Sequence, residues 1–246
     1  MTAALAIRDL KKTYRNGHVA LKGINLEVAE GDFFALLGPN GAGKSTTIGI
    51  VASLVNKSAG EVSIFGHDLE TDLAAAKSCL GLVPQEFNFN QFEPVGEIVT
   101  NQAGYYGIER REALARSENY LRRLGLWEKR RGMARELSGG MKRRLMIARA
   151  LVHEPRIVFL DEPFTGLDPH GARTLRKTLE RLRETKRTVF MVTHNLTQGL
   201  ELSDRWIILA RGRVVDQGRS ADTDAGMFER EYFDRLEAVK SKRARR

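Results

Sequence analysis

A glycine-rich segment between an apolar run and a helical pattern constrains this chain more than any other feature. It consists of Gly38, Pro39, Asn40, Gly41, Ala42, Gly43, Lys44, Ser45 and Thr46, and it fits the pattern G-x-x-x-x-G-K-[ST]. The preceding run, Phe33–Leu37, predicts a strand buried on both faces, and the following residues predict a helix over 44–55. Glycines let backbone N–H groups converge on an anion, while the helix start and Lys44 supply positive charge. The segment therefore predicts a phosphate-binding loop in an α/β fold.

The size and composition of the chain favour one α/β domain with an insertion. Its 246 residues are 42% hydrophobic and 29% charged, which is enough apolar material for a core. No apolar stretch approaches the roughly 18–20 residues that cross a bilayer, and the N-terminus predicts no signal peptide. Cys79 is the only cysteine, so no intramolecular disulfide is possible and a reducing compartment is expected. The net charge of +9 indicates an anionic partner: nucleic acid, nucleotide or an acidic membrane face.

Strand and helix patterns divide the chain into an α/β core and an inserted helical segment. Strands are predicted at 5–10, 24–28, 33–37, 62–65, 80–83, 156–160, 188–192, 205–210 and 213–215. Helices are predicted at 44–55, 95–106, 109–124, 139–152, 169–185 and 224–239. We therefore expect a nucleotide-binding core with a β subdomain over 1–85 and 156–220, a helical subdomain over 86–155, and a C-terminal helix with a basic tail over 221–246.

Two carboxylates follow the apolar strand predicted at 156–160. Asp161 and Glu162 are expected at the C-terminal edge of the sheet, where ligands of α/β folds bind. Asp161 suits Mg²⁺, directly or through water, and Glu162 suits the polarisation of an attacking water. The alternative is an ordinary strand that ends in an acidic turn, and the nearby phosphate loop disfavours it.

A third motif makes a family resemblance specific. Leu137-Ser138-Gly139-Gly140-Met141 opens a predicted helix, in which Ser138 is a good N-cap and the glycines leave N–H groups accessible to a phosphate. The predicted helix carries Met141, Leu145, Ala148 and Val152 on one face and Lys142, Arg143 and Arg144 elsewhere. Together with the two motifs above, this segment resembles the ABC ATPase family. Further family positions follow the family order over residues 4–218: Tyr14, Gln85, Asp168 in Gly166-Leu167-Asp168, and His194.

The resemblance implies a P-loop NTPase (RecA-like) core with an antiparallel β subdomain and an inserted α-helical subdomain. It also implies that the chain binds ATP and Mg²⁺ and transfers a phosphoryl group to water. By resemblance, Glu162 is the general base, His194 contacts the γ-phosphate, and Ser45, Gln85 and Asp161 serve Mg²⁺ and the water. The other implied contacts to ATP are Tyr14, residues 38–46 and, from the second chain of a nucleotide-sandwich dimer, Ser138, Gly139 and Gly140, with Asp168 coupling the two sites.

A finer likeness concerns exporters. Met141 replaces the usual Gln of the motif, as in ABC-2 type exporters, and residues 1 to about 163 look like YadG-type ABC-2 exporter ATPases. Residues 164–169 and 194–195 look more like drug, polysaccharide or haem exporter ATPases. The resemblance implies a cytoplasmic ATP-dependent homodimer on the inner face of the cell membrane, bound to a separate ABC-2 type transmembrane permease. The alternatives are a soluble ABC ATPase that acts on nucleic acid or ribosomes and a non-hydrolysing clamp. No specific nucleic acid partner is expected.

Residues outside the motifs carry weaker expectations. His18, His67, His153 and His170 are predicted to be surface residues, and Cys79 a packed small residue. Five aromatic residues are expected either in the core of the helical subdomain or in a groove for a helix of the membrane partner: Phe87, Phe89, Phe92, Tyr105 and Tyr106. The tail at 240–246 holds five cations, which favours weak contact with anionic lipid.

Overall fold

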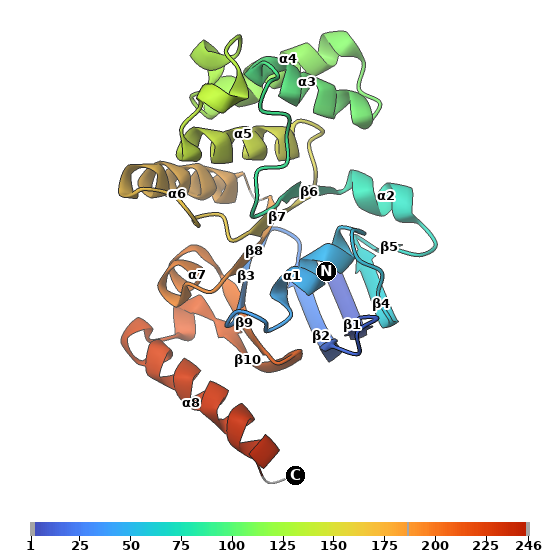
Figure 1. Cartoon of the computed structure of the whole chain (residues 1–246), viewed down its shortest axis with the longest axis vertical. Coiled ribbons are helices and arrows are strands. Elements are labelled where there is room, and N and C mark those ends of the chain that lie inside the picture. Colours follow the sequence, from blue (N-terminus) through green and yellow to red (C-terminus); the bar gives the residue numbers. More distant parts are fainter. Residues whose placement is uncertain (1–2, 186, 245–246) are drawn as a thin grey trace. The chain divides into compact units, whose positions relative to one another are not determined.

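The chain consists of two compact units (Figure 1). The computed structural model describes residues 3–185 and 187–244, and the side chains at 225 and 238–244 are outside that description. The first unit joins Met1–Ala76 to Thr188–Arg246, and the second unit is Lys77–Arg187. The predicted boundaries at 85, 156 and 220 group residues by expected role, whereas the two units are divided by compactness. The predicted domains therefore remain a prediction.

An antiparallel sheet forms one half of the first unit. Its strand order is β2-β1-β4-β5, with β1 at Ala3–Thr13, β2 at Val19–Ala29, β4 at Ala59–Ile64 and β5 at His67–Asp68. Ile7 of β1 lies opposite Leu26 on one side and Val62 on the other, and all three side chains are buried. The predicted strands at 5–10, 24–28 and 62–65 fall in this sheet, which confirms the antiparallel β subdomain.

Parallel strands form the other half of the first unit. The fully buried β3 (Phe33–Leu37) pairs in parallel with β8 (Thr188–Thr193) and β9 (Arg205–Ala210), and β10 (Arg213–Arg219) pairs antiparallel to β9. Two helices that end this unit, α7 (Leu196–Leu202) and α8 (Ala225–Ala244), share a core with β3 and β9. The buried members of that core are Ala35, Leu37, Leu200, Trp206, Ile208, Phe228 and Tyr232. This packing places the C-terminal end of β3, where residues 38–46 begin, next to the segment that joins β8 to α7.

The helix after the glycine-rich segment is shorter than predicted. Helix α1 spans Lys44–Val51, whereas the apolar pattern predicted a helix over 44–55. Ser53 adopts a left-handed φ of +58°, and the amides of Leu54 and Val55 both donate to the carbonyl of Gly49. The helix thus ends at Val51, and the following residues form a hydrogen-bonded turn. Their apolar side chains match a helical pattern, which is why the sequence predicted a longer helix.

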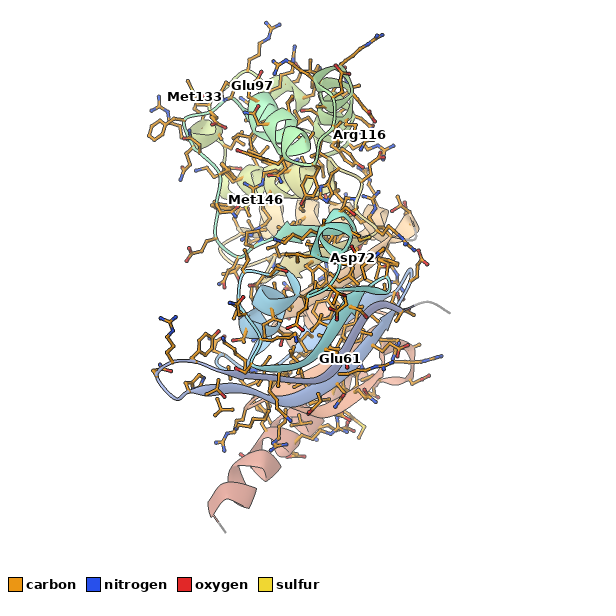
Figure 2. The ribbon with its side chains drawn as sticks, turned by 90° about the vertical axis from the view of Figure 1, so that its right-hand side faces the viewer. Glu61, Asp72, Glu97, Arg116, Met133 and Met146 are labelled. Carbon is orange, nitrogen blue, oxygen red and sulfur yellow. The ribbon has the colours of Figure 1, made fainter. Side chains whose placement is uncertain are left out.

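The second unit stacks four helices beside a parallel strand pair. Strand β6 (Leu80–Val83) pairs with β7 (Ile157–Asp161), and α3 (Val95–Tyr105) and α4 (Arg110–Arg123) pack on each other and on α5 (Gly139–Leu151). Helix α6 (Pro169–Glu184) packs on α5 and buries Leu175, Leu179 and Leu182, as predicted from their spacing. Figure 2 labels Met146 on α5 inside this unit, and Glu97 and Met133 at its periphery.

Short elements escaped the sequence analysis. Strand β5, helix α2 (Leu73–Ser78), helix α7 and three 3₁₀ turns, η1 (Trp127–Lys129), η2 (Ala134–Glu136) and η3 (Ser220–Asp222), were not predicted. Each is too brief for a periodic pattern to develop, because one or two turns expose only two or three core positions. Within the described part of the chain, no helix combines the length and the apolar character needed to cross a membrane.

The prediction that all four loop histidines lie on the surface was wrong for His153. Its ring is half-buried, stacks on Tyr106 with centroids 3.6 Å apart, and lies with Nε2 2.9 Å from the carbonyl oxygen of Leu80. Burial lowers the pKa of His153 to about 4, and the charges of Arg187 and Arg116 act in the same direction. The polar character of His153 did not reveal this, because its partners come from distant parts of the sequence.

His153 should make this protein sensitive to mild acid. Because its pKa is lower in the folded chain, only the unfolded chain binds the extra proton between about pH 6.5 and pH 4, so stability falls as the pH drops through this window. His153→Gln keeps a donor for Leu80 and does not titrate. We expect wild type to lose roughly 1 kcal/mol more than this variant between pH 7.5 and pH 5, measured by urea unfolding. Equal losses in the two proteins would contradict this role of burial.

Candidate functional site

The glycine-rich segment folds around the ammonium group of Lys44. This side chain is only 6% exposed, and its Nζ donates to the carbonyl oxygens of Gly38 (2.7 Å) and Pro39 (3.1 Å). Gly38 and Gly43 are required by close approaches, since a Cβ would lie 2.2 Å from the carbonyl oxygen of Leu209 at the first and 2.8 Å from that of Ala20 at the second. Both also have positive φ values, +154° and +111°. The loop therefore presents its backbone and a buried cation at the N-terminus of α1, as an anion site requires.

The predicted stacking aromatic is attached to this loop. The hydroxyl groups of Tyr14 and Thr46 lie 3.1 Å apart, and the ammonium of Lys12 lies 4.9 Å from the centre of the Tyr14 ring. Ser45, the next residue toward the loop, is exposed at the start of α1. The first unit thus brings Tyr14 and residues 38–46 together, although 23 residues separate them in the sequence.

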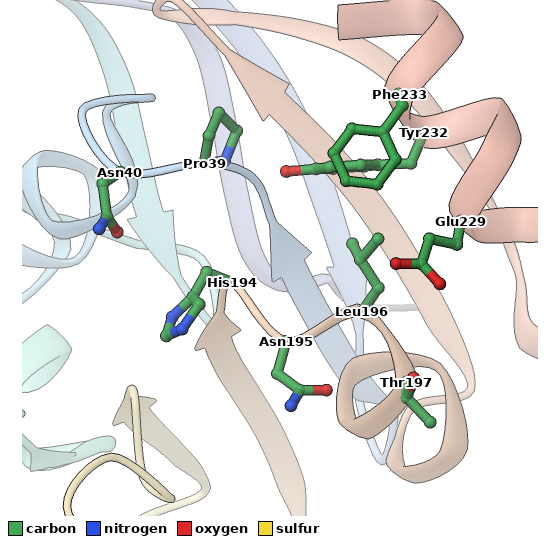
Figure 3. Close-up of a pocket in the computed structure, with 9 residues that line it drawn as sticks. All are labelled: Pro39, Asn40, His194, Asn195, Leu196, Thr197, Glu229, Tyr232 and Phe233. Atoms are coloured by element: carbon green, nitrogen blue, oxygen red, sulfur yellow. The ribbon is translucent and has the colours of Figure 1, made fainter.

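His194 lies at the C-terminal end of β8 and shares a pocket with the loop (Figure 3). This pocket holds about 450 Å³, and both Pro39 and Asn40 line it. Asn195 caps the following helix α7, because its Oδ1 accepts from the amide of Gln198 at 2.9 Å. The other lining residues are Leu196, Thr197, Glu229, Tyr232 and Phe233. The sequence analysis missed all of these, and for the three on α8 no local pattern could have revealed them, because only the packing of α8 brings them here.

Asp161 and Glu162 lie at the C-terminal end of β7 in the second unit, as predicted. Both side chains are buried, Glu162 with 7% exposed. Glu162 adopts a left-handed φ of +46°, an uncommon conformation for a residue with a side chain, which costs about 1 kcal/mol or more and frequently marks functional sites.

The Ser138–Gly140 motif begins α5 next to the start of α6. Ser138 is the N-cap of α5 and accepts from the amide of Met141 at 3.3 Å, while Asp168 is the N-cap of α6 and accepts from the amide of Gly171 at 2.7 Å. A Cβ on Gly140 would lie 3.2 Å from the Cα of Gly171, so the two helix starts are closely packed. A pocket of about 190 Å³ is lined by both motifs: Ser138, Gly139, Gly140, Met141, Arg144, Gly166, Asp168, His170, Gly171 and Thr174.

Gln85 follows β6 with an exposed side chain, and its backbone is held by Arg143. The guanidinium of Arg143 donates to the carbonyl oxygens of Pro84 (2.7 Å) and Gln85 (2.9 Å). The prediction grouped Arg143 with residues away from the apolar face of α5. In the structure it is 2% exposed and more deeply buried than Met141, which was placed on that face. Two backbone carbonyls offset the cost of burying this charged side chain by accepting from its terminal nitrogens, although its Nε has no hydrogen-bond partner among the described residues. The helical pattern contains no sign of those acceptors.

The residues predicted to hold Mg²⁺ are chemically suited to it. Ser45, Gln85 and Asp161 offer a hydroxyl, an amide oxygen and a carboxylate, which are the hard oxygen ligands that Mg²⁺ prefers. Across the described residues, no group of three or more His, Cys, Asp or Glu side chains could hold a metal ion.

Comparison with known proteins assigns the chain to a family. Residues 21–165 match the family model described as ABC transporter. This chain belongs to the ABC transporter family. It is 35% identical over 218 residues to the linearmycin resistance ATP-binding protein LnrL of Bacillus subtilis, which covers 89% of this chain and 70% of that protein. It is 32% identical to the Nod factor export ATP-binding protein I of Cupriavidus metallidurans, covering 98% of this chain and 80% of that protein.

A solved structure extends the comparison to the fold. The dimeric, post-hydrolysis ATP-binding cassette MJ0796 bound to ADP and Pi superimposes with a TM-score of 0.79 at 29% identity, covering 88% of this chain and 98% of that one. The family resemblance, the P-loop NTPase fold and the class of ATP hydrolase predicted from the motifs are thereby confirmed. The roles of single residues in this ABC chain and its likeness to the YadG type stay predictions.

Proposed function

We propose that this ABC chain binds and hydrolyses ATP in a homodimer and thereby powers export through a separate transmembrane permease. The observation that carries the proposal is the first unit's phosphate-type loop, in which Lys44 is buried against loop carbonyls and His194 lines the same pocket as Pro39 and Asn40. In a chain of this family, such a loop is expected to receive the phosphates of ATP.

The loop supplies binding, and polar groups at strand ends supply chemistry. Backbone N–H groups of residues 38–46 and the Lys44 ammonium would hold the β- and γ-phosphates, with Tyr14 against the adenine. Glu162 would take a proton from the attacking water, and His194 would donate to the γ-phosphate. Ser45, Gln85 and Asp161 would hold Mg²⁺, which when bound neutralises phosphate charge.

A dimer would complete each site. The Ser138–Gly140 motif presents the N-terminus of α5, a second anion-binding element, in a pocket of its own with Asp168. The structural neighbour MJ0796 is dimeric. We propose that Ser138, Gly139 and Gly140 contact the ATP held by the loop of a second copy, and that Asp168 couples the two sites.

Export is the direction that the names of the relatives favour. The Nod factor export proteins and the linearmycin resistance protein are exporters or resistance factors by name. Phe92 and Tyr105 are 68% and 85% exposed, so the prediction of a buried core role is wrong for these two, while a groove for a permease helix remains a proposal. We place the dimer on the cytoplasmic face of the membrane with an ABC-2 type permease. The proposed lipid contact through residues 240–246 falls on side chains outside the described residues.

Release of inorganic phosphate from ATP by the purified chain tests this function. We expect turnover with Mg²⁺, a fall of at least about tenfold when EDTA removes the ion, and ATP-dependent dimerisation in size-exclusion chromatography. Since a permease can be required for activation, the assay is repeated with the co-purified membrane partner. Absence of Mg²⁺-dependent phosphate release in both formats would overturn the proposal.

A further inference from the structure

Three basic side chains of α5 hold the segment that follows β6. This segment, residues 84–91, is called the Gln85 loop below. Besides the Arg143 bonds to Pro84 and Gln85, Arg149 donates to the carbonyl oxygen of Asn88 (3.2 Å) and to its Oδ1 (2.6 Å). Lys142 Nζ donates to Oε1 of Gln91 at 3.3 Å. The Gln85 loop is therefore hydrogen-bonded to α5 at the start, the middle and the end of the loop.

Arg143 is the most deeply buried of these three side chains. It is 2% exposed, whereas Lys142 is half-buried and the bonds of Arg149 lie at the exposed edge. Its guanidinium also lies 5.1 Å from the centre of the Phe87 ring, so it contacts residues on both sides of Gln85's peptide. Burial lowers the pKa of Arg143, and the negative charge of Asp161 opposes this effect. The cation is thus held inside the second unit by carbonyls, a ring and a nearby carboxylate.

The bonds from Arg143 to two consecutive carbonyls fix the orientation of the backbone at Gln85. Because the carbonyls of Pro84 and Gln85 both accept from one planar guanidinium, the two peptide groups that flank the Cα of Gln85 are fixed in orientation as well as in place. That orientation sets the direction in which the Gln85 side chain leaves the backbone. A Lys ammonium at the same site has no planar fork and would hold the two carbonyls less rigidly.

We propose that Arg143 is a positioning residue that fixes the backbone at Gln85 so that the Gln85 side chain meets Mg²⁺ and the attacking water in the geometry needed for ATP hydrolysis. This inference rests on the proposed function of the ABC chain. Arg143 lies on the helix that begins with Ser138–Gly140, so the same rigid helix carries the motif that receives the second ATP and the anchor of Gln85. In this proposal Arg143 acts only through the Gln85 backbone.

The test is a double-mutant cycle on the rate of ATP hydrolysis. We compare wild type, Arg143→Met, Gln85→Ala and the double variant, with Arg122→Met as a control, because Arg122 is an exposed arginine of α4 paired with Glu118. Arg143→Met should lower kcat by about tenfold, with a KM for ATP within about twofold of wild type, because the loop around Lys44 still binds the phosphates. The control should match wild type.

Non-additivity separates positioning from general destabilisation. If Arg143 acts through Gln85, the double variant should be no slower than Gln85→Ala alone, to within about twofold. Each of three results would overturn the inference. The fold-losses in kcat of the two single variants could multiply in the double variant, kcat could be unchanged in Arg143→Met, or Arg143→Met could raise KM while kcat is preserved. Wild type without turnover, both alone and with the co-purified membrane partner, would instead overturn the proposed function, so the two failures are distinguishable.

A conservative variant protects the test against misfolding. Arg143→Lys retains a buried cation, so it should fold and bind ATP while losing several-fold in kcat. Amide hydrogen exchange should then quicken within residues 85–91 and stay unchanged in α3 and α4. If Arg143→Met does not fold, the cycle is run with Arg143→Lys, and an Arg143→Lys enzyme with wild-type kcat and wild-type exchange would count against positioning.

Discussion

Replacing Glu162 with Gln should lower the rate of ATP hydrolysis by about 10²–10⁴-fold, the range typical for loss of a general base. Glu162 follows the end of β7, is 7% exposed, and adopts a left-handed backbone conformation. Gln has the same size and the same backbone preference but cannot accept a proton from water. The chemical step should therefore fail while the fold and the ATP contacts persist.

Phosphate release under saturating ATP and Mg²⁺ measures this change, and size-exclusion chromatography measures its consequence. Because ATP is bound but not hydrolysed, the Glu162→Gln chain should accumulate as a dimer in ATP. Glu180→Gln is the matched control, since Glu180 is an exposed glutamate of α6, and it should behave as wild type. A Glu162→Gln chain that retains more than about a tenth of wild-type activity would assign the base to another group.

Replacing Lys44 with Ala should weaken ATP binding by about 100-fold or more. The ammonium of Lys44 is enclosed by the loop, where it donates to the carbonyls of Gly38 and Pro39, so it lies where phosphate oxygens would be received. Hydrogen bonds to charged partners contribute about 1.5–3 kcal/mol each. The loss of two such bonds from the Lys44 ammonium to phosphate oxygens of ATP gives the expected factor. Catalysis should fall with binding, since a site without nucleotide cannot turn over.

Thermal unfolding with and without ATP measures the binding loss, because a ligand that binds only the folded chain stabilises it by RT ln(1 + [L]/Kd), a quantity that falls as Kd rises. Wild type should be stabilised by ATP, and Lys44→Ala should not be at the same concentration. Lys57→Ala is the control, since Lys57 also lies in the first unit but its ammonium is paired with Glu70 at 2.8 Å. ATP stabilisation of Lys44→Ala equal to that of wild type would exclude the proposed phosphate role.

Much of the site was predictable because the decisive chemistry is local. A strand, a glycine loop and a helix are adjacent in the sequence, so the pattern of residues 33–51 alone predicts the anion site. The caps at Ser138 and Asp168 are likewise made by amides three positions ahead. Asp161 and Glu162 needed only the rule that polar residues at the carboxyl end of a buried strand face the ligand side.

The wrong predictions concern residues whose burial depends on contacts distant in the sequence. Arg143 was expected away from the buried face of α5, yet its acceptors are the carbonyls of Pro84 and Gln85, 59 and 58 positions earlier in the sequence. His153 was expected on the surface, yet it packs against Tyr106 and lies beside the carbonyl oxygen of Leu80. In both cases a backbone carbonyl or ring from a distant part of the sequence offsets part of the cost of burying a polar side chain, whereas side-chain type alone predicts exposure.

The sequence by itself determined the family, the order of the longer strands and helices, and the identity of the residues expected to bind and hydrolyse ATP, because each depends on patterns among neighbours a few positions apart. Tertiary structure alone decided which arginine is buried behind Gln85, which aromatic residues stay exposed, and that α8 brings Tyr232 and Phe233 to the pocket of His194. Those outcomes depend on which surfaces meet when the chain packs, and packing energies arise between residues that no local pattern relates.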